Sequence, residues 1–342
     1  MELYLDSADL KEIEEVFKLG FVAGLTTTPT FMHREGITEL DSTIVKISKM
    51  VPMLQIEALG NNADEICAEA HRLLKLGLDK KRTVFKIPAS LEAMKATKRL
   101  RDEDIMVNIH LVYNLQQAYM AMAAGANYIC ILVGRMQDQG YNALELVEEC
   151  VNAVRYYGYN SKIMFSSVRH TQHVRESMML GAHTCTIPWK VMKQLTENNF
   201  TAIGTDQFIA HTRLITMKVK DVVRSENPVI GQNKKVSDAL VKMTESGLGA
   251  VSIVDENSRL LGLFTDGDLR RQLKNEGAAF LQKNLSDFNF TKTPITISPD
   301  AILQEAVKIF KEKHIDNILV VSDGKPAGVL DIQDLINLNL MV

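Results

Sequence analysis

The stretch Thr83-Val84-Phe85-Lys86-Ile87-Pro88 places one lysine inside an otherwise apolar run of β-branched and aromatic residues. A short run of this composition is typical of a buried strand in a parallel sheet. Because burial disfavours the ammonium form, we expect Lys86 to have a lowered pKa and a neutral amine that can form a Schiff base with a carbonyl. The alternative is a lysine at a strand end whose head group reaches solvent. Taken alone, the stretch favours this alternative, and the surrounding sequence reverses the choice.

Apolar strands alternate with amphipathic helical segments through the first two hundred residues. Strands are expected at 3–5, 22–27, 53–57, 84–87, 106–111, 128–133, 163–168 and 184–188, with helices between them, for example at 64–76 and 143–156. Eight such strand–helix units predict an α/β fold, a compact (β/α)8 TIM barrel. An open doubly wound sheet is the alternative, but no glycine-rich phosphate turn follows the first strand.

Charged side chains follow the predicted strands at their carboxyl ends, where the catalytic groups of a barrel project. They are Asp6, Glu57, Lys86, His110, Arg135 and Arg169. One polar group at a strand end only starts a loop, but this many at one mouth exceed what solvation requires. The set favours carbonyl activation by the lysine, proton transfer by the carboxylates and phosphate binding by the arginines.

An internal repeat occupies the last third of the chain, after a helical stretch that runs from about Thr205 towards Lys218. The segment Gly262–Leu269 matches Gly328–Leu335, and the segments before each also match. Each copy is expected to form a helix, two strands and a helix, which is too small to bury a core alone, so the copies should pack together as an α+β pair. We expect domains at 1–216 and 217–342, with the repeats at about 217–276 and 283–342.

Composition excludes several classes of partner. With 39 basic and 42 acidic residues the net charge is −3, which gives no reason to expect nucleic acid or an anionic membrane surface. No apolar run approaches the roughly 18 residues of a membrane helix, and the N-terminus lacks a signal-peptide pattern. The cysteines show neither disulfide nor metal spacing, so we expect free thiols, a cytoplasmic protein and no metal site. They are Cys67, Cys130, Cys150 and Cys185.

Five short segments appear in an order that resembles the transaldolase family, and most closely its short branch of fructose-6-phosphate aldolases and TalC-like transaldolases. They are Met1–Asp6, Ala23–Pro29, Phe85–Pro88, Val133–Arg135 and Ser166–Arg169. The resemblance covers about the first 210 residues and implies a (β/α)8 barrel of class I aldolase type.

The resemblance also implies roles for individual residues. Lys86 matches the Schiff-base lysine, Asp6 an acid/base group and Glu57 the group that holds the catalytic water. Arg135 and Arg169 match positions that bind the substrate phosphate. Beside the second arginine lies Ser167, which we include in the expected substrate site.

Four positions around the same pocket depart from the family pattern. Thr28 replaces an asparagine that hydrogen-bonds the dihydroxyacetone part of the substrate, and a threonine is shorter with a single hydroxyl. His110 replaces a threonine that helps to hold the catalytic water, Leu132 an aromatic residue and Cys130 a serine. These changes argue against an unmodified transaldolase or fructose-6-phosphate aldolase. His110 is either a direct general acid/base, because imidazole titrates near neutrality, or a packed core histidine.

The repeats resemble a tandem CBS domain pair, and Gly262–Arg271 is similar to the CBS tail of bacterial arabinose-5-phosphate isomerases. The resemblance implies a regulatory adenosyl or cytidyl nucleotide, or a nucleotide-sugar, with Thr265 at the phosphate and Asp268 at the ribose. Asp334 is the second-repeat counterpart, but Asp331 replaces the hydroxyl residue there and would repel phosphate, so we expect one competent half-site. A pair that serves only for dimerisation is the alternative.

These features predict a metal-independent enzyme that forms a Schiff base through Lys86 and cleaves or makes a carbon–carbon bond in a phosphorylated sugar, regulated by a nucleotide. Two alternatives stay open. The barrel could be inactive and sense a sugar phosphate for a partner, or it could be a sugar-phosphate isomerase or epimerase that uses His110. The transaldolase relatives of the short branch form rings and CBS pairs often dimerise, so a homo-oligomer is expected.

Overall fold

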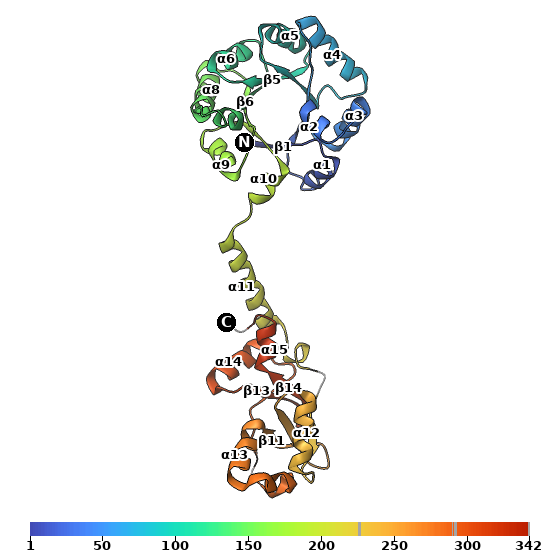
Figure 1. Ribbon diagram of the computed structural model, residues 1–342, viewed down its shortest axis with the longest axis vertical. Helices are drawn as coiled ribbons and strands as arrows, with labels where there is room; N and C mark the ends of the chain where they lie inside the picture. The colour runs from blue at the N-terminus through green and yellow to red at the C-terminus, as the bar shows by residue number, and fades with distance from the viewer. Residues whose placement is uncertain (225–226, 289, 291–292, 341–342) are drawn as a thin grey trace. The chain divides into compact units, whose positions relative to one another are not determined.

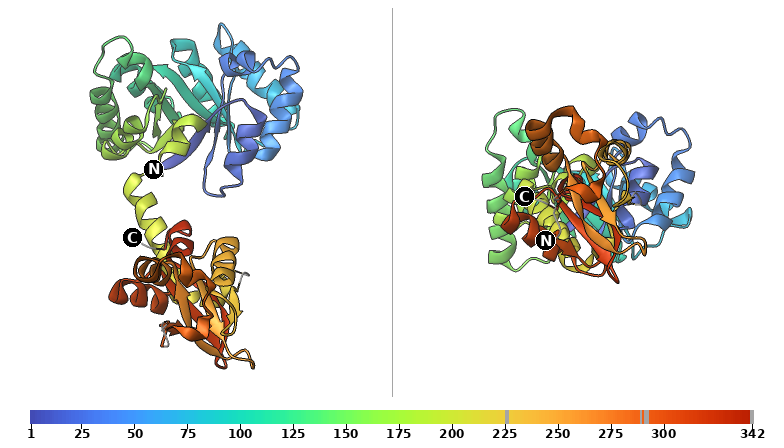
Figure 2. Two further views of the ribbon diagram at one scale, coloured as in Figure 1. Left: turned by 60° about the horizontal axis from the view of Figure 1, so that its bottom comes forward. Right: turned by 90° about the horizontal axis from the view of Figure 1, so that it is seen from below.

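The computed structural model describes residues 1–224, 227–288, 290 and 293–340. The chain forms two compact units, Met1–Glu197 and Asn198–Val342 (Figures 1 and 2). Helix α11 (Asn199–Thr216) lies in the second unit. The predicted domain boundary, after residue 216, lies at the C-terminal end of α11, whereas the second unit begins just before its N-terminal end. The boundary stays a prediction.

The first unit is a closed barrel of parallel strands in the order β1 to β8, surrounded by helices (Figure 1). The strands are β1 (Glu2–Asp6), β2 (Gly24–Thr26), β3 (Leu54–Glu57), β4 (Thr83–Pro88), β5 (Met106–Val112), β6 (Tyr128–Leu132), β7 (Lys162–Ser166) and β8 (Thr184–Ile187). The helices are α1 (Leu10–Phe17), α2 (Pro29–Arg34), α3 (Leu40–Met50), α4 (Ala63–Lys75), α5 (Leu91–Asp102), α6 (Leu115–Ala123), α7 (Val133–Gln137), α8 (Ala143–Tyr157), α9 (Thr171–Met179) and α10 (Trp189–Gln194). The predicted TIM barrel is confirmed.

Strand β4 shows how the alternation of side chains places Lys86. Phe85 and Ile87 are fully buried in the cluster between the strands and the outer helices. Val84 belongs to a different cluster, which fills the inside of the barrel together with Tyr4 and Tyr128. Successive side chains of a strand point to opposite faces, so Lys86 shares the inner face with Val84. A lysine at the carboxyl end of this strand therefore points into the barrel mouth.

Polar caps fix the points at which the helices begin after the strands. Asn62, Ser90 and Asn114 precede α4, α5 and α6, and each side chain accepts the backbone N–H three residues further on. A side-chain cap of this kind is worth about 1 kcal/mol of helix stability. These caps keep the loops at the mouth of the barrel short and ordered.

The second unit contains α11 and two repeats with matching elements. The first holds β9 (Val229–Gly231), α12 (Val236–Ser246), β10 (Ala250–Val254), β11 (Leu260–Thr265) and α13 (Asp266–Glu276), and the 3-10 turns η1 (Val219–Asp221), η2 (Gly277–Gln282) and η3 (Leu285–Asp287) lie around them. The second holds β12 (Thr296–Ile297), α14 (Leu303–Lys313), β13 (Asn317–Ser322), β14 (Lys325–Asp331) and α15 (Ile332–Asn337). Each repeat has a third short strand, β9 or β12, that the sequence analysis missed because two or three residues show no periodicity.

The two repeats pack against each other, as expected. A shared apolar cluster joins Leu248, Ala250 and Leu263 of the first repeat to Leu319 and Val329 of the second. The segment before β9 also packs with the second repeat. Val219 is fully buried in the second-repeat core, and Lys218 pairs with Ile302 as an isolated β-bridge.

Candidate active site

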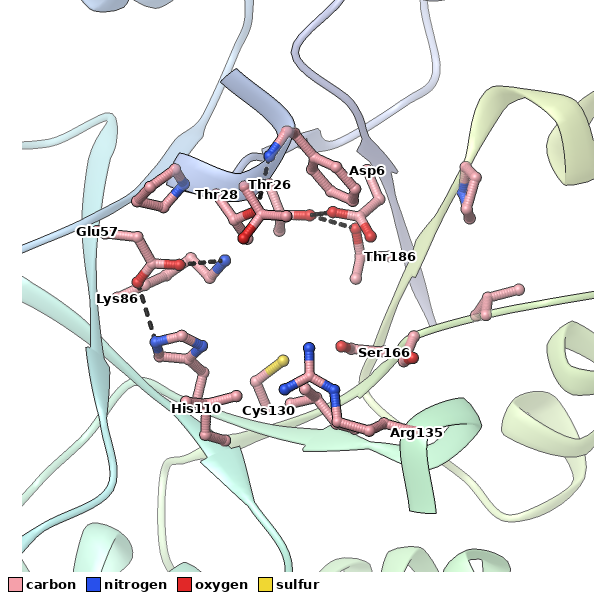
Figure 3. Close-up of a pocket in the computed structure, with 18 of the residues that line it drawn as sticks. Asp6, Thr26, Thr28, Glu57, Lys86, His110, Cys130, Arg135, Ser166 and Thr186 are labelled. Atoms are coloured by element: carbon pink, nitrogen blue, oxygen red, sulfur yellow. Dashed lines mark hydrogen bonds and ion pairs between the residues drawn. The ribbon is translucent and has the colours of Figure 1, made fainter. Parts of the chain in front are cut away.

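A cavity of about 610 Å³ opens at the carboxyl ends of the barrel strands. Most residues that line it lie on strand ends or on the loops that follow them (Figure 3). The barrel site residues expected from the sequence all line this cavity, and they are Asp6, Thr28, Glu57, Lys86, His110, Arg135, Ser167 and Arg169. Cys130 and Leu132, which depart from the family pattern, line it as well.

Lys86 lies at the base of the cavity and is only 4% exposed. Its Nζ donates to the carbonyl oxygen of Thr27 at 3.0 Å and lies 3.1 Å from Oε1 of Glu57. The expectation of a lowered pKa is wrong for this state of the protein. Burial pulls the pKa of Lys86 down, but the charge of Glu57, the smaller effect of Asp6 and the bond to Glu57 outweigh it and raise the pKa above its ordinary value. The resting group is an ammonium paired with a carboxylate.

Glu57 stands between Lys86 and His110 (Figure 3). Its Oε2 lies 2.9 Å from Nε2 of His110, without the geometry of a regular hydrogen bond. Burial raises the pKa of Glu57, but the charges of Lys86 and His110 prevail and lower it, so the carboxylate is ionised. Burial lowers the pKa of His110 despite this carboxylate, and Lys86 and Arg135 add to the effect. Near neutral pH the three groups are an ammonium, a carboxylate and a neutral imidazole.

Strand β5 is distorted directly after His110. Leu111, the next residue, has a φ of +56°, and the pairing with β6 shifts between Ile109 and Val112. A left-handed conformation costs a non-glycine residue about 1 kcal/mol or more, and such distortions concentrate near functional sites. The distortion lies directly beside the imidazole.

Asp6 belongs to a second group of polar side chains in the same cavity, together with Thr26 and Thr186 (Figure 3). Oδ1 of Asp6 accepts a hydrogen bond from the hydroxyl of Thr26 at 2.8 Å, and this hydroxyl also contacts that of Thr186. Burial raises the pKa of Asp6, although Lys86 and Thr26 oppose the shift. Thr26 and Thr186 were missed in the sequence analysis. The register of the strands is what would have indicated Thr26, because it pairs with Asp6 on the neighbouring strand.

Thr28 and Cys130 are held by local structure. Thr28 precedes α2, and its hydroxyl oxygen accepts the N–H of Phe31 at 3.3 Å, which leaves the hydroxyl hydrogen for another partner. Burial raises the pKa of the Cys130 thiol to about 11. This thiol is therefore protonated at neutral pH and is a poor nucleophile.

Arg135 and Arg169 lie exposed on two neighbouring turns. Nη1 of Arg135 donates to the hydroxyl of Tyr113 at 3.2 Å, and Nη2 of Arg169 lies 2.7 Å from Asp138. The turns approach each other so closely that a Cβ on Gly134 would lie 1.9 Å from the carbonyl oxygen of Ser167. Only glycine allows this approach, which brings together the backbone segments that carry the two arginines.

Arg34, at the end of α2, also lines the cavity and was not singled out from the sequence. Among the residues that the structure describes, it has no acidic partner. The fold places it there, because α2 directly follows Thr28 at the mouth of the barrel. Within the described part of the chain, no cluster of three or more His, Cys, Asp or Glu side chains could hold a metal ion.

The candidate nucleotide residues of the repeats are engaged with their own chain. Thr265 caps α13, and its backbone N–H and hydroxyl both donate to Oδ2 of Asp268, whose Oδ1 pairs with Arg271. Asp334 accepts from Nη2 of Arg224 at 2.7 Å. Both aspartates are thus bonded to other side chains, Asp268 to Arg271 of the same helix and Asp334 to Arg224 in the segment before β9.

Two further features concern the whole chain. The four cysteines are buried and unpaired, in line with the expectation of free thiols. Within the described ranges, the helices are too short or too polar to span a membrane.

Comparison with known proteins confirms both resemblances. The family "Transaldolase/Fructose-6-phosphate aldolase" matches residues 3–242, and the CBS domain family matches 219–275 and 285–340. A probable transaldolase of Desulfotalea psychrophila is 36% identical over 211 residues, which cover 61% of this chain and 97% of that protein. One from Coprothermobacter proteolyticus is 36% identical over 212 residues, with 61% and 95% covered.

Solved structures match the repeats. A CBS-domain-containing protein from Agrobacterium tumefaciens is 24% identical with a TM-score of 0.33, and the match covers 36% of this chain and 92% of that one. The structure of CBSX2 in complex with AMP is 25% identical with a TM-score of 0.31, and covers 36% of this chain and 96% of that one. The likeness to arabinose-5-phosphate isomerases stays a prediction.

Proposed function

This chain belongs to the transaldolase/fructose-6-phosphate aldolase family and carries a C-terminal CBS pair, and on that premise we propose that it is a metal-independent enzyme that forms a Schiff base through Lys86. It acts on a phosphorylated sugar and breaks or makes a carbon–carbon bond. One observation carries the proposal. A lysine with 4% exposure points into a cavity of about 610 Å³ and contacts a carboxylate at 3.1 Å.

Schiff-base formation starts from the Lys86–Glu57 ion pair. When a carbonyl substrate enters, the ammonium gives a proton to the carboxylate of Glu57, and the neutral amine attacks the carbonyl carbon. The resulting carbinolamine loses its hydroxyl as water when Glu57 returns the proton, and a protonated imine remains. His110 is the second group that can carry this proton, because its imidazole is neutral near pH 7 and lies 2.9 Å from Glu57. We assign it this role in place of a water molecule.

Asp6 is the group that we assign to bond cleavage. A carboxylate with a raised pKa is a stronger base than an ordinary aspartate, and burial raises the pKa of Asp6. It removes the proton of the hydroxyl two carbons from the imine, so that this carbon becomes an aldehyde and the bonding electrons pass to the imine. The enamine that remains is either protonated and hydrolysed or adds to a second aldehyde.

Arg135 and Arg169 are the proposed phosphate ligands, with Ser167 beside them. Guanidinium groups bind phosphate through two parallel hydrogen bonds, and both groups lie exposed at the mouth. Thr28 is the proposed contact for those hydroxyls of the sugar that lie near the imine carbon, because the hydrogen of its own hydroxyl is still free to donate.

The CBS pair is the proposed regulatory part of the enzyme. We propose that it binds an adenosyl or cytidyl nucleotide through the first repeat, where Thr265 and Asp268 lie side by side. Asp334 is the corresponding candidate in the second repeat. Binding in either repeat requires that the ligand displace part of the local network around these aspartates.

Reductive trapping tests the catalytic proposal. Borohydride is added with dihydroxyacetone, glycolaldehyde, acetaldehyde or a set of sugar phosphates, and the modified peptide is identified by mass spectrometry. We expect a stable adduct on Lys86 with at least one of them. A complete set without any adduct would sink the proposal and favour a barrel that only senses sugar phosphates.

Lys86→Arg separates this chemistry from an isomerase that uses His110. Guanidinium stays protonated and cannot attack a carbonyl, so a Schiff-base enzyme loses its activity. An isomerase in which the cation only polarises the carbonyl would keep measurable activity in this variant.

A further inference from the structure

His173 lies behind the two arginine turns, in the first turn of α9, and is only 2% exposed. Its Nδ1 accepts a hydrogen bond from the backbone N–H of Arg169 at 3.2 Å. Because Nδ1 is the acceptor, the hydrogen of the neutral ring is on Nε2, which lies 2.6 Å from Oε1 of Gln137 and donates to it. Both ring nitrogens are therefore used.

The two partners of His173 belong to the two elements that carry the arginines. Gln137 is the last residue of α7, the five-residue helix that also contains Arg135. This short helix has no side-chain cap at its start, so its position depends on such contacts. The other partner is the backbone of Arg169 itself. The imidazole thus connects the α7 turn to the turn after β7.

We propose that His173 is a positioning residue that fixes the spacing of Arg135 and Arg169 for one bound phosphate. The inference rests on the proposed function, in which these arginines hold the phosphate of the substrate. His173 is assigned no contact with the substrate, and it acts through the backbone of Arg169 and the side chain of Gln137. Misplacing one of the two guanidinium groups that line the cavity weakens phosphate binding far more than it disturbs the fold.

The charge of the ring supports this arrangement. Burial lowers the pKa of His173, and the neighbouring His170 and Arg169 side chains lower it further, whereas Glu176 and Asp138 oppose the shift. The ring is therefore neutral near pH 7, and Nδ1 keeps the lone pair that accepts the N–H of Arg169.

The test measures the binding of inorganic phosphate to the full-length protein by titration calorimetry. His173→Leu removes both bonds and should weaken phosphate binding about tenfold, since neither the backbone of Arg169 nor the side chain of Gln137 is then held by α9. His173→Asn places an amide oxygen near the position of Nδ1, so it should keep the bond to Arg169 and stay within about threefold of wild type.

His183 offers a matched control at the other end of the same strands. It is half-buried, and its Nδ1 also accepts a backbone N–H, that of Ile163, at 3.1 Å. His183→Leu should lower the melting temperature and leave phosphate affinity unchanged. Wild-type affinity in His173→Leu, or an equal loss in both leucine variants, would overturn the proposal, and so would a wild-type protein that binds no phosphate.

Two additions keep the outcome decisive. If His173→Leu does not fold, His173→Gln replaces it, because the longer amide reaches Gln137 but not the N–H of Arg169. We expect about fivefold weaker phosphate binding, and wild-type affinity would again contradict the role.

Trapping with dihydroxyacetone, which has no phosphate, should proceed equally in wild type and His173→Asn. Failure of trapping in the wild type would overturn the proposed function alone, because the phosphate titration does not depend on Lys86.

Discussion

At the barrel mouth the candidate residues face an open cavity, whereas the candidate residues of the CBS pair already bind their own chain. Glu57 contacts Lys86 and His110, which themselves line the cavity. Asp268 is bonded instead to the Thr265 that caps its helix. The pattern of a threonine and an acid three residues later is also that of a capping box, so helix geometry alone accounts for it. The two family resemblances thus have different force at the two sites.

The difference follows from the architecture of each region. A parallel barrel sends the side chains at its strand ends into one shared space, whatever their chemistry, so several charges there require a reason beyond folding. A helix start selects threonine and aspartate without any ligand. The predictions below test where this contrast holds.

The largest effect is expected at Lys86. Lys86→Met removes the nucleophile and should lower activity by about 10⁴-fold or more and abolish the borohydride adduct. Lys75→Met, at an exposed position of α4, serves as the control and should behave as wild type. Equal activity of the two variants would mean that the buried lysine of the barrel mouth is as incidental as a surface lysine.

Glu57→Gln should reduce turnover by about 10²- to 10³-fold, because the proton acceptor for the Lys86 ammonium is lost. The change also removes the carboxylate that helps to raise the pKa of Lys86. The pKa of the lysine should therefore fall, and the pH at which trapping becomes fast should move to lower values. The rate of adduct formation as a function of pH measures both effects, and an unmoved profile would contradict the ion pair.

Thr265→Ala tests whether the cap of the first repeat also binds a ligand. Loss of the cap should cost about 1 kcal/mol of stability, and AMP or CMP affinity should fall about tenfold if Thr265 holds the phosphate. Asp331→Ala is the matched control, because Asp331 caps α15 by accepting the N–H of Gln333 at 2.8 Å. It should lose similar stability and no nucleotide affinity. Identical binding by both variants and wild type would leave Thr265 as a structural cap.

The smallest effect is expected at Arg34. Arg34→Ala removes one exposed cation from the cavity mouth, where it has no acidic partner among the described residues. Phosphate affinity should fall only about threefold at low ionic strength, and the difference should vanish at high salt. A loss that persists at high salt would indicate direct contact with the ligand.

Much of the barrel could be predicted because each strand carries its own signal. Phe85 and Ile87 on one face, with Lys86 between them on the other, already predict a strand with a polar residue turned inward. The direction of the Lys86 pKa shift could not be predicted, because it depends on the 3.1 Å contact with Glu57 of the neighbouring strand, a contact that the strand pattern alone does not predict.

Contacts that join distant segments were hidden for the same reason. His173 looks like an ordinary residue at the start of a helix, and only the fold brings it between Gln137 and Arg169. Arg34 lies on a helix too short to show a face. In the repeats, the sequence indicates Thr265 and Asp268 but not that they are bonded to each other.

The burial of Val219 in the core of the second repeat has a consequence for how this protein can be taken apart. The segment that leads into the first repeat is built into the second, so cutting the chain between the repeats would strand a fully buried valine and expose an apolar surface in each fragment. Neither repeat is then an independent module. A graft, a deletion or a gene fusion that respects this fold must move the pair together with the preceding residues from about 198 onward, because the second unit begins at Asn198.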